Sequence, residues 1–452
     1  MPKGEPKIGG RIQRLRRDKG VSQAQLATAL GISPSYLNLI EHKRRRVTVG
    51  LLLKFAHYFG VEAGELAESD KSRLAGDLME LFGDEMFTDL ELTNHDVHDV
   101  AVSNTKVAQA LVRLFDNYLA LRKRDGHSSG IPFDTSMGVA TDAVSDFLQH
   151  NNNYFPELEE AAARVRADID LASETFDQGL KTYLYNVYGL KWRHGTRADM
   201  PPGGIWRENG EITTDELLPA ESAVFSVAQH LGHLVCVNEI DRLLEEAALP
   251  TEAAPIAREA LAAYFAAALV MPYEPFYRTC VVTRYDIERV GRTFKVSFEQ
   301  VCHRMTTLQR PGLSGVPFHL VRTDIAGNIS KRFSLSGIHI PRHSGACPRW
   351  NVYSAFLHPE RLNVQISQMP EGERYLCIAK SITKGGYRYN APRRYLSIGL
   401  GCHIVHASAL IYSDGIDLSS KEQTVPIGIG CRVCPRENCG QRAHPQVRGA
   451  RD

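Results

Sequence analysis

The chain has 452 residues, of which 43% are hydrophobic and 23% charged, so it can bury two or three cores. Its net charge is only +1, yet residues 1–50 hold eleven Lys and Arg against three acidic residues. The excess of positive charge is therefore concentrated in the first 50 residues, and the chain is not basic throughout. This distribution favours phosphate binding at the N-terminal end of the chain. The N-terminus has no apolar secretory stretch, and the longest apolar run, residues 260–272, is too short to span a bilayer. We therefore expect a cytoplasmic protein with no membrane partner.

Residues 13–41 carry the start and stop signals of a helix-turn-helix. Ser22 and Ser33 are residue types that accept the free amide donors at a helix start, and Pro34 suits a first helical position. Gly31 tolerates the left-handed backbone that ends a helix. We predict helices over residues 22–30 and 33–41, the second of which enters a DNA major groove. The residues expected to form the core of this head are Leu26, Leu30, Ile32, Leu37 and Ile40.

The surface of the predicted head is suited to double-stranded DNA. Polar side chains of the second helix would face base edges, and the basic run just after it would bind phosphates. The predicted DNA-binding residues are Gln23, Ser33, Ser35, Tyr36, Asn38, Leu39, Lys43, Arg44, Arg45 and Arg46. The alternative is a protein-binding helical module with a solvated basic face. We interpret the chain as a sequence-specific transcription factor that binds an operator.

Four domains are expected along the chain, with an α+β, multidomain fold overall. They are an all-α helix-turn-helix head (1–66), a helical linker (67–130), a zincin-like α+β domain without its zinc site (131–310) and a C-terminal α+β sensor domain (311–452). The linker carries an apolar stripe at helical spacing, formed by Val100, Val107, Leu111, Leu114, Tyr118 and Leu121. This stripe favours a homodimer or higher oligomer, with packing inside its own domain as the alternative.

Residues 228–234 resemble the zinc-binding helix of zinc peptidases, but the residues that would bind zinc and activate water are replaced. Gln229 stands at the first ligand position and His230 at the general-base position, which leaves His233 alone. Residues 264–272 resemble the later helix of ImmA/IrrE-type metallopeptidases, and that resemblance puts Leu261 where an acidic third ligand is expected. One imidazole does not hold catalytic zinc, so we expect no enzymatic activity. His230 and His233 are either ligands of some other metal or ordinary polar residues of a partly buried helix.

Three cysteines near the C-terminus are spaced to reach one metal centre. Cys431, Cys434 and Cys439 fall within nine residues, and a fourth ligand would come from elsewhere, with Cys347 as the best candidate. Cys402 and Cys377 are further options, and His444 is one if the ion is zinc. The spacing leaves three interpretations open: a [4Fe-4S] cluster, zinc, or no metal. The cysteines expected to be plain core thiols are Cys236, Cys280 and Cys302.

Together, the Cro-type head, the degenerate ImmA/IrrE-like domain and the cysteine motif resemble the short-chain fatty acyl transcriptional regulators of the PrpR/RamB type. The most distinctive stretches are residues 324–332, 345–352 and 426–435. The resemblance covers most of the chain. It implies control of propionate, acetate or glyoxylate-pathway genes, with acyl-coenzyme A as the effector.

Such an effector would need cations for its phosphates and an apolar end for its acyl arm. The residues that offer this chemistry are Lys331, Arg332, Arg342, Arg349 and Trp350. Arg393 and Arg394 are a further option, and the alternative for each residue is a surface charge without a ligand. Two other functions stay open at this point: a redox or iron-sensing transcription factor, and a regulatory zinc metallopeptidase.

Overall fold

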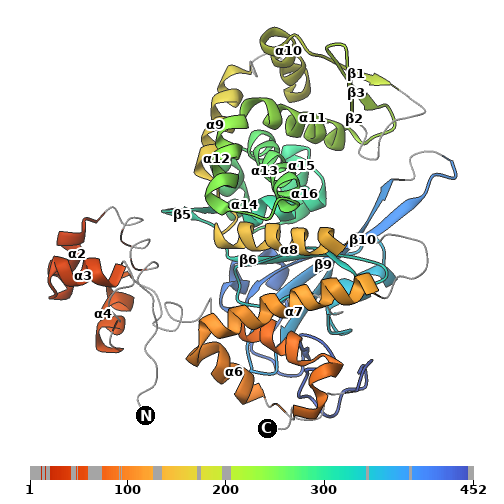
Figure 1. Cartoon of the computed structure of the whole chain (residues 1–452). Helices are drawn as coiled ribbons and strands as arrows, with labels where there is room; N and C mark the ends of the chain where they lie inside the picture. The colour runs from red at the N-terminus through yellow and green to blue at the C-terminus, as the bar shows by residue number, and fades with distance from the viewer. Residues whose placement is uncertain are drawn as a thin grey trace. The chain divides into compact units, whose positions relative to one another are not determined.

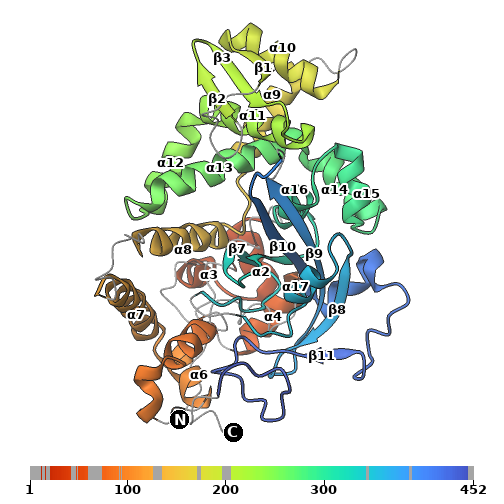
Figure 2. The same ribbon diagram turned by 90° about the vertical axis from the view of Figure 1, so that its right-hand side faces the viewer.

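The computed structural model describes residues 12, 16, 21–41, 47, 49–59, 74–90, 92, 94–125, 135–169, 175–195, 205–342, 346–385 and 389–445 (Figures 1 and 2). These residues divide into two compact units. The first comprises residues 1–118, 341–344 and 429–452, and the second comprises residues 119–340 and 345–428. The polypeptide therefore crosses from one unit to the other four times.

The N-terminal part of the first unit is a small helical head. Its helices are α2 (Gln23–Leu30), α3 (Pro34–Glu41) and α4 (Val49–Phe59). They share a hydrophobic core of their own, in which Leu26, Leu37 and Phe55 are fully buried. Of the five predicted core residues, four are buried and Ile32 packs against the core from its edge, which confirms the predicted head.

The rest of the first unit is built around the helix at residues 74–82. It continues with η1 (Glu85–Leu90), α6 (Asn94–Ser103) and α7 (Thr105–Asp125), whose last residues belong to the second unit. Two distant segments are held on the helix at 74–82. The Arg342 guanidinium donates to the Asp77 carboxylate at 2.9 and 3.1 Å, and a Cβ at Gly83 would lie 2.5 Å from the Val433 side chain.

The helical half of the second unit surrounds α13 (Ala253–Val270), which packs against α9 (Pro156–Asp168) and α11 (Ala220–Val235). Arg304 and Glu159 form a buried ion pair beside it, with an Nη1 to Oε1 distance of 2.6 Å. A three-stranded sheet has the order β1-β3-β2. The remaining elements are α8 (Thr135–His150), α10 (Phe176–Tyr188), β1 (Lys191–Gly195), β2 (Ile205–Glu208), β3 (Glu211–Asp215), α12 (Val237–Ala247), α14 (Tyr273–Val282), α15 (Ile287–Phe294) and α16 (Phe298–Thr306).

The other half of the second unit is a six-stranded mixed sheet with the order β11-β8-β9-β10-β6-β7. Its strands are β6 (Phe318–Asp324), β7 (Ile329–Ser334), β8 (Asn363–Gln368), β9 (Arg374–Gly385), β10 (Arg393–His403) and β11 (Thr424–Pro426). One face carries Phe318, Leu376 and Leu400 into the large core shared with the helices. The opposite face is covered by the short helix α17 (Asn351–Ser354), as Figure 2 shows. The predicted change from helix to β structure after residue 312 is confirmed. Short elements complete this half: β4 (Gln309–Arg310), β5 (Leu313–Ser314), η2 (Ala355–Leu357), η3 (Ile404–Ala409) and η4 (Ile411–Ser413).

Among the described helices, α13 alone is long and apolar enough to cross a membrane by length and composition. However, 61% of this 18-residue apolar segment is buried inside the protein. Its apolarity is explained by its central place in the core.

Candidate functional sites

The turn between α2 and α3 has the capping chemistry expected from the sequence. The Ser22 hydroxyl accepts the amide of Gln25, and the Gln25 side chain accepts the amide of Ser22. Gly31 ends α2 with φ +69°, a conformation that favours glycine, and the Ser33 hydroxyl accepts the amide of Tyr36 at the start of α3. These bonds fix how α3 leaves the turn.

The far end of α3 is held by a buried carboxylate. Glu41 accepts two hydrogen bonds from the Arg16 guanidinium, at 2.6 and 3.0 Å, and a third from the Gln23 amide at 2.6 Å. Because the side chains of Arg16 and Glu41 are almost fully buried, each charge depends on the other. Arg16 is therefore part of the head's framework and is not available as a phosphate contact.

The predicted DNA-binding residues have different surroundings. Asn38 and Leu39 project from the exposed side of α3, whereas Tyr36 packs partly against the head's core. Ser33 is a helix cap and Gln23 is bound to Glu41. The basic run predicted to follow α3, comprising Lys43, Arg44, Arg45 and Arg46, lies outside the described residues, as does the side chain of Ser35.

The peptidase-like helix α11 faces a carboxylate that the sequence analysis missed. Leu261 is fully buried in the core, while Glu259, two residues earlier on α13, lies beside α11. Its carboxylate accepts the Gln229 amide at 2.9 Å and lies 3.1 Å from His233 Nε2. Glu259 is the only acidic residue of α13, which was the available signal. Hydrogen bonds thus join the two helices at the position where a zincin would place its metal.

His230 lies on the same helix without a matching partner. Its Nε2 atom is buried and makes no hydrogen bond with the described residues. Burial lowers the pKa of His230, and the nearby Arg207 acts in the same direction. Among the residues that the structure describes, no three His, Cys, Asp or Glu side chains gather as a metal-binding group.

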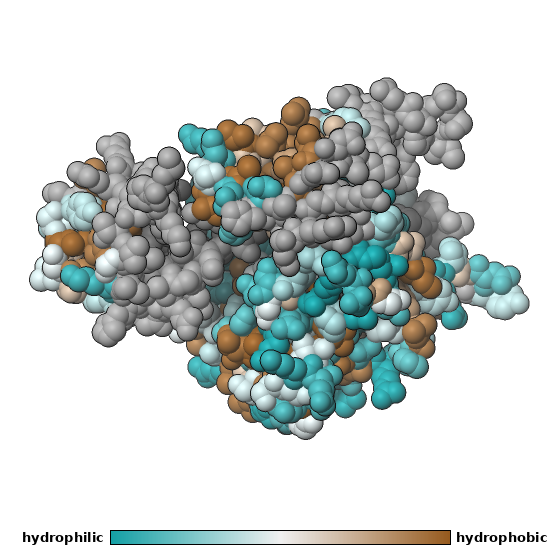
Figure 3. Space-filling view, turned by 90° about the horizontal axis from the view of Figure 1, so that it is seen from below, coloured by the Kyte–Doolittle hydropathy of each residue, from teal (hydrophilic) through white to brown (hydrophobic). Residues whose placement is uncertain are grey.

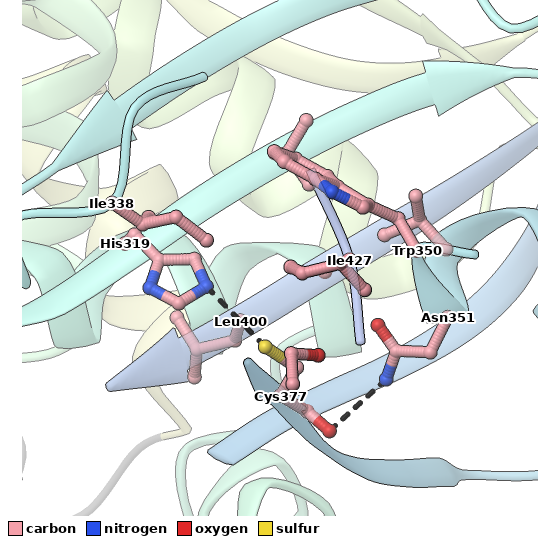
Figure 4. A pocket seen from close by; sticks show the side chains of 11 residues that line it. His319, Ile338, Trp350, Asn351, Cys377, Leu400 and Ile427 are labelled. Atoms are coloured by element: carbon pink, nitrogen blue, oxygen red, sulfur yellow. Dashed lines mark hydrogen bonds between the residues drawn. The ribbon is translucent and has the colours of Figure 1, made fainter. Parts of the chain in front are cut away.

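A cavity of about 20 Å³ lies on the sheet face beneath α17, which is space for a single water (Figure 4). Its walls are mostly apolar, with a few polar groups from neighbouring strands. The lining residues are His319, Val321, Ile338, Trp350, Asn351, Val352, Ser367, Cys377, Gly399, Leu400 and Ile427. Gly399 lines the cavity, and a Cβ there would lie 2.5 Å from Val352. Gly401 lies behind the lining residue His319, and a Cβ there would lie 2.5 Å from the His319 ring.

The polar groups of this cavity are neutral. Figure 4 shows His319 and Cys377 pointing toward each other, with Nε2 and Sγ 3.8 Å apart. The other imidazole nitrogen of His319 lies 2.7 Å from the Ser336 hydroxyl. Burial lowers the pKa of His319 to about 3 and raises the pKa of Cys377 to about 11. The cavity therefore suits an uncharged group and does not activate the thiol.

The five predicted effector residues do not form one cluster. Trp350 lines the cavity and donates its indole N–H to the Gly428 carbonyl, and Arg349 donates to the Pro426 carbonyl. Arg332 is paired with Asp142 on α8, and Arg342 belongs to the first unit, where it pairs with Asp77. Lys331 is exposed, with Nζ 3.5 Å from His303 Nε2.

The three C-terminal cysteines lie in a loop that is wound around Arg442. The Arg442 guanidinium donates to the carbonyls of Cys431, Cys434 and Arg436, at 2.6, 3.1 and 2.6 Å. The amide of Ala443 donates to the Cys431 thiol at 3.3 Å. Cys439 is partly exposed in the same loop, while Cys347 is a buried thiol of the second unit.

The other cysteines lie within the core. Cys236, Cys280 and Cys302 are fully buried, as predicted, and burial raises the pKa of each thiol. Cys402 is also buried in the core of the sheet.

Comparison with known proteins assigns each part of this architecture. Residues 12–66 match the helix-turn-helix family, residues 190–306 the IrrE N-terminal-like domain, and residues 307–451 the C-terminal domain described as "Short-chain fatty acyl coenzyme A regulator". The HTH-type transcriptional regulator RamB of Mycobacterium tuberculosis is 38% identical over 98% of this chain and 96% of its own length. The chain belongs to the short-chain fatty acyl-coenzyme A regulator family.

Other members of this family agree with the assignment. The transcriptional regulator PrpR of M. tuberculosis is 34% identical over 98% of this chain and 92% of its own. The propionyl-CoA carboxylase regulator of Cereibacter sphaeroides is 35% identical over 97% and 94%. A solved M. tuberculosis transcriptional regulator superposes with a TM-score of 0.65 at 37% identity, over 68% of this chain and 94% of that one. The expectation of a DNA-binding regulator, as opposed to an enzyme, is confirmed.

Proposed function

We propose that the protein represses or activates genes of short-chain fatty acid metabolism in response to an acyl-coenzyme A. The observation that carries this proposal is the joining, in one chain, of a helix-turn-helix head to a domain of the short-chain fatty acyl-coenzyme A regulator type. The name of one relative, the propionyl-CoA carboxylase regulator, favours propionate metabolism, and the family resemblance adds acetate and glyoxylate metabolism. A regulator that binds an operator acts where the DNA is, so we propose a cytoplasmic location.

The DNA contact would be made by α3. Asn38 and Leu39 are exposed on this helix, and the bonds at Ser22, Ser33 and Glu41 hold it in one orientation. Asn is a residue type that forms two hydrogen bonds with the major-groove edge of adenine, accepting from N6 and donating to N7. Tyr36, being partly buried, would contribute by packing more than by contacting bases.

The acyl group would enter the sheet-face cavity beside Trp350. Its apolar walls and neutral polar groups suit a short acyl chain. Since the cavity holds only about 20 Å³, Trp350 and Val352 must move for even a two-carbon group to enter. The binding of the effector would then be coupled to a change in this wall of the domain.

The same wall is continuous with the segment that carries the cysteines. Ile427 lines the cavity, and Trp350 holds the Gly428 carbonyl at 3.0 Å. Gly428 is the last residue of the second unit, and Ile429 begins the final segment of the first. A movement of Trp350 would therefore be passed on through covalent bonds, which gives the effector a physical means of changing DNA binding.

We also propose a homodimer, formed through α7. Val107 and Leu114 are 47% and 65% exposed on this helix, and Leu111 lies between them on the same stripe. Figure 3 shows hydrophobic side chains gathered on one face of the molecule. A second copy would bury this stripe and present two heads to the two halves of an operator.

Cys431, Cys434 and Cys439 are proposed to hold an iron–sulfur cluster, with zinc as the alternative metal. In support, none of the three cysteines is taken up by a disulfide with a described residue, and Cys431 accepts a backbone N–H, a bond that stabilises thiolate ligands. The thiols do not converge as a metal group in the described structure, so the loop would have to close around the ion. The fourth ligand, Cys347, stays a sequence prediction. Such a site would make redox or iron sensing a second input.

The test is calorimetric titration of the full chain with acetyl-, propionyl- and butyryl-coenzyme A, alongside the Trp350→Ala variant. We expect heat with at least one ligand and a loss of at least tenfold in affinity for the variant. The matched control is Trp206→Ala, which removes a partly exposed indole of the β1-β3-β2 sheet. No heat with any ligand would contradict the proposal, and an iron–sulfur absorption band without ligand binding would favour the redox sensor.

A further inference from the structure

The strands β9 and β10 extend beyond the sheet as a two-stranded ribbon. The neighbour β8 pairs with β9 only as far as Ala379, and β6 pairs with β10 only from Leu396 onward. Residues 383–385 and 393–395 therefore pair with each other alone. Figure 1 shows this ribbon projecting from the sheet. At about 3.4 Å per residue, the paired strands of this ribbon project by roughly 10 Å.

The segment that contains β9 and β10 carries positively charged side chains and no negatively charged ones. Residues 374–413 contain six Lys and Arg and no Asp or Glu, although the whole chain carries a net charge of only +1. Two of these cations are paired with carboxylates of α15 and α16, Lys380 with Glu288 and Lys384 with Glu299. Lys384 lies opposite Arg394 in the ladder, so one cation of this pair is neutralised by Glu299 and the arginine is left exposed.

Arg393 and Arg394 are the outer cations that the structure describes. Both are exposed, and neither side chain makes a hydrogen bond or ion pair with any described residue. They are adjacent in an extended strand, so their side chains leave opposite faces of the ribbon. Two tyrosines accompany them, with Tyr389 96% and Tyr395 48% exposed. The ribbon is therefore cationic on both faces and carries aromatic groups.

We propose that this ribbon is a second DNA-binding element, which contacts the phosphate backbone of a duplex without reading its sequence. A groove of B-form DNA admits a two-stranded ribbon and has a phosphate strand along each wall. One arginine on each face can therefore reach both walls. Guanidinium groups are suited to this contact because they bind phosphate through two N–H groups.

The shape of the ribbon favours duplex DNA over the phosphates of a small effector. Coenzyme A is bound in concave sites that bury most of its surface. The ribbon is convex, and the cavity at Trp350 is lined by other residues. The inference builds on the DNA binding of the family, but it needs neither the acyl-coenzyme A response nor the metal.

The experiment measures the affinity of the full chain for a random-sequence 40-base-pair duplex over a series of salt concentrations. For Arg393→Ala/Arg394→Ala, loss of two phosphate contacts should flatten the slope of log affinity against log salt by about 1.8. At 0.15 M salt the affinity should fall by about 10- to 30-fold. Arg393→Lys/Arg394→Lys keeps both charges and should keep most of the slope.

The matched control is Arg289→Ala/Arg292→Ala, which removes two exposed cations of α15 and changes the net charge equally. A ribbon variant that binds the duplex like this control would overturn the inference. So would a variant that loses only acyl-coenzyme A binding, or a wild-type chain that prefers single strands. Failure of the wild type to bind any duplex would instead contradict the proposed regulator itself.

Discussion

Glu41, the last residue of α3, shares its carboxylate between Arg16 and Gln23 inside the head. Both members of the ion pair are buried, so removing one charge leaves the other without compensation. The orientation of α3, the proposed DNA-contacting helix, therefore depends on this buried polar contact as well as on the apolar core residues.

The Glu41→Gln variant tests this contact. It keeps the size of the side chain and leaves the Arg16 charge buried, so we expect the head to lose about 3–5 kcal/mol of stability. Hydrogen exchange of the amides in α2 and α3 measures the loss in the full chain. The control is Glu274→Gln, whose exposed pair with Arg278 should contribute less than about 1 kcal/mol. Equal protection of the head in both variants would contradict the assignment.

The close packing of Gly401 against the His319 ring gives a second prediction. A Cβ at Gly401 would lie 2.5 Å from the His319 ring and 2.8 Å from the Leu376 carbonyl, and that backbone atom cannot move aside. Gly401→Ala should destabilise the second unit by about 1–3 kcal/mol and displace the His319 ring, which lines the cavity, so that acyl-coenzyme A heat falls. Urea unfolding and calorimetry check both effects. Gly50→Ala, where a Cβ meets nothing, should not destabilise the protein. An equally stable Gly401→Ala would show that the His319 ring and its neighbours are not tightly packed against this glycine.

His319 makes stability depend on pH. Its folded pKa of about 3 lies below the unfolded value of about 6.5, so the unfolded chain binds the proton first as the pH falls. The stabilisation is complete above about pH 6.5 and is lost progressively toward pH 3. At pH 5.5 the second unit should be about 1.4 kcal/mol less stable on account of this residue than at pH 7.5. His319→Asn should remove that part of the dependence in urea unfolding; an unchanged difference between the two pH values would refute it.

Arg442 is predicted to hold the cysteine loop closed. Arg442→Ala removes three hydrogen bonds to loop carbonyls, so Cys434, which is only 8% exposed, should become accessible. Its reaction with a maleimide should be about tenfold faster or more, because each 1.4 kcal/mol of lost loop stability is tenfold in the open population. Lys421→Ala, an exposed position, serves as the control. Unchanged reactivity would mean that the loop is held by other contacts.

The head could be predicted closely because its signals are local. Ser22, Gly31 and Ser33 each act on their own helix ends, and the apolar spacing defines the core. The interaction of Glu41 with Arg16 joins residues 25 positions apart and had no such signal.

The sites of the second unit depend on contacts between distant strands and helices, which the sequence does not display. Register alone brings His319 opposite Gly401 and Gly401 opposite Cys377. Arg332 was predicted to bind a ligand from its place in a basic motif, but it is paired with Asp142, 190 positions away. Likewise, Glu259 replaces Leu261 beside the degenerate peptidase helix because the helical turn points the latter into the core.

The central claim is that an acyl-coenzyme A changes the sequence-specific DNA binding of this chain. The most direct measurement is selection of genomic fragments by the purified full chain, with and without propionyl-coenzyme A, followed by sequencing of the bound DNA. We predict enrichment of a small set of fragments next to genes of short-chain fatty acid metabolism, and a change in that enrichment when the ligand is present. Equal recovery of all fragments, or enrichment that the ligand leaves unchanged, would contradict the account.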